Sequence, residues 1–121
     1  MNKLTIHSGA VLTVSDDASL TVSGDLVNQT GNTGLVLQSS AASTASLVHS
    51  SHDTPATVQR YISGSSNLTD MSYHLVSVPV SSGAVSGWWL DSYLYRFDAP
   101  GQAWVAMGTS TTTPLSVDQG Y

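Results

Sequence analysis

The sequence predicts an all-β protein, in which a short parallel β-solenoid-like repeat section is joined to a small antiparallel β-sandwich. An eight-residue pattern occurs twice in tandem, at residues 9–16 and 17–24, and each copy contains Leu-Thr-Val. Glu is absent and only 9% of the residues are charged, so the composition disfavours helices. Every aromatic residue lies at or beyond Tyr61, which indicates that the two sections have different cores.

The first predicted section spans residues 1–54 and consists of short strands separated by Gly, Asp and Asn turns. Apolar and polar residues alternate along these strands, as in strands with one buried face. The two octads are expected to stack as successive rungs, and residues 39–45 are expected to form a loop or wide turn. The expected strands are residues 4–6, 11–14, 19–22, 26–27, 35–38 and 46–48. The side chains expected to face inward are Leu4, Ile6, Leu12, Val14, Leu20, Val22, Leu35, Leu37 and Leu47.

The second predicted section spans residues 55–121, with antiparallel strands expected at 56–62, 73–78, 92–97 and 104–107. The segment 98–102 predicts a hairpin turn, because Pro100 fixes φ and Gly101 can adopt the positive φ that follows. The side chains expected to form an aromatic core are Trp89, Tyr93, Tyr95, Phe97 and Trp104.

Charge and composition exclude several classes of function. The net charge of −5, with only three Lys and Arg residues, disfavours binding to nucleic acids and to anionic membranes. Cysteine is absent, and no apolar run is long enough to span a bilayer. The first residues lack the apolar core of a signal peptide, so a secreted protein would carry its signal outside this chain.

The sequence resembles a module found in secreted surface proteins of Bacteroidetes, where it often precedes a sorting domain of the type IX secretion route. The resemblance implies a secreted or cell-surface, adhesin-like β module without established catalytic residues. Further strands usually follow the Gly-Tyr pair in that module, so we expect the chain to be truncated at its C-terminal end. The runs that carry the resemblance are LTIHSGAVLTV (4–14), LTVSGDLVN (20–28), ASLVH (45–49), ATVQRYI (56–62), YHLVSVP (73–79) and LYRFD (94–98), with Trp104, Pro114-Leu115 and Gly120-Tyr121.

Two groups of residues are candidate metal ligands. His49, His52 and Asp53 could bring two imidazoles and a carboxylate to one ion if they share a loop. Stacked solenoid turns would bring Asp16, Asp17 and Asp25 to one edge, where Ca²⁺ could bind. Asp is also a common turn residue, and we favour a structural role for these carboxylates. No other cofactor is expected.

No catalytic motif is recognisable, so we expect a non-enzymatic structural or adhesion module. The alternative is a carbohydrate-binding module, because exposed indole rings can stack on sugars while a carboxylate bonds their hydroxyls. A second alternative is self-association through open sheet edges, by exchange of strands. The possible partners are thus a glycan, another surface protein or a second copy. The candidate ligand-binding residues are Trp88, Trp89, Asp91 and Tyr93.

Overall fold

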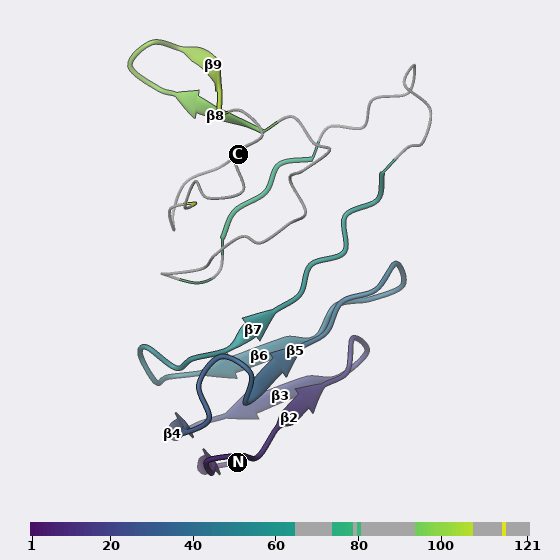
Figure 1. Ribbon diagram of the computed structural model, residues 1–121, viewed down its shortest axis with the longest axis vertical. Helices are drawn as coiled ribbons and strands as arrows, with labels where there is room; N and C mark the ends of the chain where they lie inside the picture. The colour runs from purple at the N-terminus through teal and green to yellow at the C-terminus, as the bar shows by residue number, and fades with distance from the viewer. Residues whose placement is uncertain (65–73, 79, 81–93, 108–114, 116–121) are drawn as a thin grey trace. The chain divides into compact units, whose positions relative to one another are not determined.

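The computed structural model describes residues 1–64, 74–78, 80, 94–107 and 115, in two compact units, Met1–Ser72 and Tyr73–Tyr121 (Figure 1). Its described residues form nine strands and no helix, which confirms the all-β prediction. Within this described part, no helix has the length and apolarity needed to cross a membrane.

The first unit contains two successive triplets of strands that pair in parallel. Each strand of the first triplet pairs with its counterpart in the second: β1 with β4, β2 with β5, and β3 with β6. A further strand, β7 (Thr57–Val58), adds in parallel to β5, so that β2, β5 and β7 lie side by side (Figure 1). The first triplet is β1 (Lys3–Ile6), β2 (Leu12–Val14) and β3 (Ser19–Val22), and the second is β4 (Asp25–Asn28), β5 (Leu35–Leu37) and β6 (Ser46–His49).

The octad has a different structural meaning from the one predicted. Leu4, Leu12 and Leu20 recur at every eighth position, but they belong to three different sheets. Their partners in register are Leu26, Leu35 and Leu47 of the second triplet. The two octads therefore do not stack on each other as expected. Eight residues contain one short strand and the turn after it. The chain passes through three such strands, one in each sheet, before β4 returns to the sheet of β1.

Aliphatic side chains from all three sheets form the core of the first unit. Leu35 and Val22 are the most completely enclosed, with exposed fractions of 0% and 1%. The predicted inward alternation is confirmed for β2, where Val14 is buried and Thr13 is exposed. The buried set is Ile6, Val14, Val22, Leu26, Leu35, Leu37 and Ala45, with Leu4, Leu12, Leu20, Leu47, Ala56 and Val58 packed against it.

After β6 the chain passes over the second triplet, and two of its side chains form hydrogen bonds with the backbone of β4. The Leu26 amide donates to the Ser51 hydroxyl at 2.7 Å, and the Thr54 hydroxyl donates to the Leu26 carbonyl at 3.3 Å. The strand expected over residues 56–62 is the two-residue β7. Because β7 pairs with β5, residues 55–58 belong to the parallel unit and not to the antiparallel section in which we expected them.

The second unit contains the predicted hairpin, formed by β8 (Tyr95–Asp98) and β9 (Ala103–Ala106) in antiparallel register. The left-handed residue of its turn is Gln102, with φ of 48°, and not Gly101 as expected. A Cβ at Gly101 would meet the Asp98 carboxylate, which accepts a hydrogen bond from the Gly101 amide at 3.1 Å and would have to move.

The hairpin base is anchored by a small aliphatic cluster. The Met107 amide donates to the Leu94 carbonyl at 2.9 Å, which extends the pairing beyond the two strands. Leu94 and Leu115 are buried, and Val76 and Val78 pack against them together with Met107. Residues 74–78, the described part of the strand expected over 73–78, are not in a strand.

Candidate functional site

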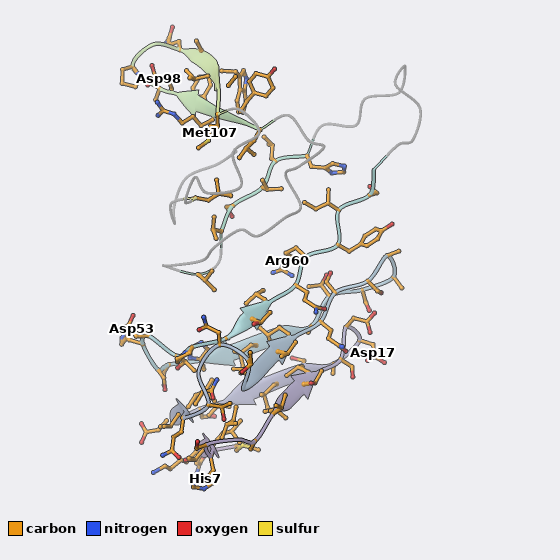
Figure 2. The ribbon with its side chains drawn as sticks, in the orientation of Figure 1. His7, Asp17, Asp53, Arg60, Asp98 and Met107 are labelled. Atoms are coloured by element: carbon orange, nitrogen blue, oxygen red, sulfur yellow. The ribbon has the colours of Figure 1, made fainter. Side chains whose placement is uncertain are left out.

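One face of the β8–β9 hairpin carries three exposed aromatic side chains. Phe97 lies opposite Trp104 in the register, and their rings meet edge to face with centroids 5.4 Å apart. Tyr95 is two residues from Phe97 on the same strand, so it lies on the same face. The exposed fractions of Tyr95, Phe97 and Trp104 are 39%, 45% and 54%. We call these three residues the aromatic face. Figure 2 labels two residues of the β8–β9 hairpin, Asp98 near its turn and Met107 at its base.

The exposure of the aromatic face corrects the prediction that Tyr95, Phe97 and Trp104 form a core. The aliphatic side chains of Leu94 and Leu115 are the buried residues in the described part of this unit. Alternation along the two strands indicates that the three rings share a face, but alternation alone does not say which face is covered. The predicted hairpin turn at 98–102 is present, and the register that it sets places Phe97 opposite Trp104.

The ligand-binding residues predicted from the sequence, Trp88, Trp89, Asp91 and Tyr93, lie outside the described residues. Their role remains a prediction. The aromatic face begins only two residues after Tyr93 in the sequence, and sequence reasoning missed it as a candidate site because its members were assigned to the core.

Asp16 is held by hydroxyl groups from the neighbouring triplet. Hydrogen bonding by the Ser40 hydroxyl lowers the pKa of the Asp16 carboxyl below its ordinary value of 3.8; partial desolvation opposes this shift, and the Ser43 hydroxyl adds to it. Asp16 lies in the turn between β2 and β3, whereas Ser40 and Ser43 lie in the loop that follows β5. The Asp16 carboxylate of the first triplet thus interacts with the loop that follows β5 in the second triplet.

The three carboxylates proposed for calcium do not share one edge as expected. Asp25 lies opposite Lys3 in the β1–β4 pair, whereas Asp16 and Asp17 occupy the turn between two other sheets. The expectation assumed that the octads stack, and they do not. No group of three or more His, Asp or Glu side chains that could hold a metal ion is found among the residues that the structure describes.

The histidine candidates lie at the end of β6 and in the turn that follows it. His49 ends β6 and is exposed, and His52 and Asp53 follow it in the next turn, where Asp53 has φ of 54°. Asp53 and Asp17 lie at opposite sides of the first unit, with His7 distant from both (Figure 2).

No protein-family model matches this chain, and neither a curated protein nor a solved structure matches it.

Proposed function

We propose that this chain is a non-catalytic structural or adhesion module of a secreted or cell-surface bacterial protein, and that its first unit is a short parallel β-solenoid. The observation that carries the proposal is the pairing of each strand of the first triplet with its counterpart in the second. A coil of this kind stacks similar residues in columns and gives a stiff spacer. The resemblance to Bacteroidetes surface modules supports the extracellular location.

Asn28 supports the coiled architecture because it joins consecutive layers. Its Nδ2 group donates to the Gly31 carbonyl at 2.7 Å and to the Pro55 carbonyl at 2.8 Å, and its Oδ1 atom accepts from the Thr30 amide at 3.0 Å. Since Pro55 lies 27 residues further on, the amide bridges β4 to the chain that passes over it. All of the polar atoms of this half-buried amide are used.

The coiled architecture is tested by the substitution Asn28→Asp. The new carboxylate would face two carbonyl oxygens and lose both donated hydrogen bonds, so we expect the free energy of unfolding to fall by about 1–3 kcal/mol at neutral pH. Asn32→Asp is the matched control, because Asn32 is exposed, and it should change stability by less than about 0.5 kcal/mol. Equal urea midpoints for the two variants would argue against this bridge.

The non-catalytic role is tested by incubating the purified chain with soluble polysaccharides and measuring released reducing ends. We expect no release above that of a heat-denatured sample. Turnover that co-purifies with the chain and is abolished by a substitution in it would contradict the proposal.

Two alternative functions remain predictions: glycan binding by the segment around Trp88, and self-association by strand exchange. Strand addition at β4 is disfavoured, because Ser51 and Thr54 already bond the Leu26 backbone on that strand. Light scattering across a concentration series distinguishes a monomer from an assembly.

A further inference from the structure

The aromatic face has the composition of a binding surface. Single exposed apolar side chains are common on proteins, whereas a contiguous apolar patch of roughly 300 Å² or more is often functional. Trp104 is the most exposed of the three rings, and Phe97 contacts it from the opposite strand. Tyr95 extends the same face along β8. Because the hairpin base is fixed by Leu94 and Met107, the rings are presented on an anchored ribbon.

The exposed area of the three rings is smaller than the whole area that each partner buries in a typical protein–protein interface. A fully buried aromatic side chain covers about 150–250 Å², so at exposed fractions of 39%, 45% and 54% the three rings present roughly 300 Å². Each partner in a typical protein–protein interface buries about 800 Å². The exposed area of the three rings suits a ligand that is a few sugar rings in length.

The charge distribution disfavours an anionic ligand. The chain has a net charge of −5, which repels anionic polysaccharides and anionic lipid surfaces. The charged residues of the hairpin, Arg96 and Asp98, alternate with Tyr95 and Phe97 along β8 and so lie on the other face. The rings themselves carry a negative quadrupole on their faces, which attracts the weakly positive C–H groups of a sugar ring.

We propose that the aromatic face of the β8–β9 hairpin binds a neutral polysaccharide, with sugar rings stacked on Trp104 and Tyr95 and with Phe97 positioning the indole. This site differs from the predicted one around Trp88, and it does not depend on the scaffold role of the first unit.

Affinity electrophoresis of the full chain tests the proposal, with a mixed-linkage β-glucan, a xylan and a galactomannan as neutral probes and alginate as the anionic probe. We expect retardation by at least one neutral probe and none by alginate. Trp104→Ala should weaken the retardation constant by about tenfold or more, since exposed aromatic anchors dominate such contacts. Val105→Ala on the opposite face, where Val105 has an exposed fraction of 38%, should leave the retardation constant unchanged.

Two conservative variants separate stacking from a role in folding. Trp104→Tyr keeps an aromatic face and should retain measurable binding, whereas Trp104→Leu keeps apolar volume and should lose it, with both variants folded by NMR. Retardation by none of the neutral probes, or equal retardation of wild type and Trp104→Ala, would overturn the site. So would binding to phosphatidylcholine vesicles in place of polysaccharide. A failure here leaves the hydrolysis test of the proposed function unaffected, because that test reads product release and not binding.

Discussion

At the scale of single residues, the first unit contains positions where a larger side chain does not fit. Gly24 is such a position, because it forms the short turn between β3 and β4 and lies directly against the backbone of Asn2. A Cβ at Gly24 would meet the Asn2 carbonyl oxygen, which is backbone and cannot rotate away. The N-terminal residues are thereby fixed against β3, where the Ser23 amide donates to the Met1 carbonyl at 2.8 Å.

Gly24→Ala is therefore expected to lower the free energy of unfolding by about 1–3 kcal/mol, as overpacking against fixed atoms does. Gly64→Ala is the matched control, because no atom lies within 4 Å of the Cβ that it would add. Urea unfolding followed by far-UV circular dichroism measures both variants. A loss for Gly64→Ala as large as that for Gly24→Ala would contradict the steric explanation.

Asp16 makes the stability of the first unit depend on pH, and the direction of this dependence follows from its lowered pKa. Because Ser40 lowers the pKa of its carboxyl, the charged form contributes stability above the ordinary value of 3.8, and this contribution is lost as pH falls through the lower folded value. In an NMR titration, Ser40→Ala should raise the Asp16 pKa toward 3.8, and Ser43→Ala should raise it less. An unchanged Asp16 titration in Ser40→Ala would show that this hydroxyl is not the cause.

At the scale of elements, the hairpin contains one local conflict between sequence and backbone. Gln102 adopts φ of 48°, a left-handed conformation that costs residues with a side chain about 1 kcal/mol or more. Gln102→Gly should remove this cost and stabilise the hairpin by up to about 1 kcal/mol.

Hydrogen exchange of the β8 and β9 amides measures this effect, and we expect it to be slower in Gln102→Gly than in the wild type. Ala99→Gly, in the same turn but without positive φ, should have the opposite effect by adding freedom to the unfolded chain. Faster exchange in Gln102→Gly than in the wild type would contradict the argument.

Strand positions were more predictable than strand partners. The tripeptide Leu12-Thr-Val14 and the hairpin turn around Pro100 follow from local alternation and turn chemistry, and both predictions are confirmed. The partner of a strand, in contrast, lies far away in the sequence, since Leu12 pairs with Leu35. The turns between paired strands vary in length, so the number of residues that separates two partners cannot be read from the octad. The exposure of Trp104 was missed for a similar reason, since burial depends on what the rest of the chain covers.

At the scale of the whole molecule, the two units have separate cores. The core of the first unit is formed by residues between Leu4 and Val58, whereas that of the second is formed by described residues beyond Tyr73. A fragment of residues 1–72 should therefore fold by itself and unfold cooperatively. Within it, the amides of β5 should exchange most slowly, because β5 is bonded to both β2 and β7 and contains the fully buried Leu35. A fragment without a cooperative thermal transition would show that the first unit depends on the second.

The octad also determines how such a chain can grow. In the coil that we propose for the first unit, duplicating eight residues would add one strand and its turn, so every later strand would move to the next sheet and Leu35 would no longer meet Leu12. In that coil, only a gain of three strands with their turns, about 24 residues, would return each leucine to the sheet of its counterpart. An insertion of one or two strands would therefore disrupt all downstream pairing in the proposed coil, whereas an insertion of three would lengthen the scaffold.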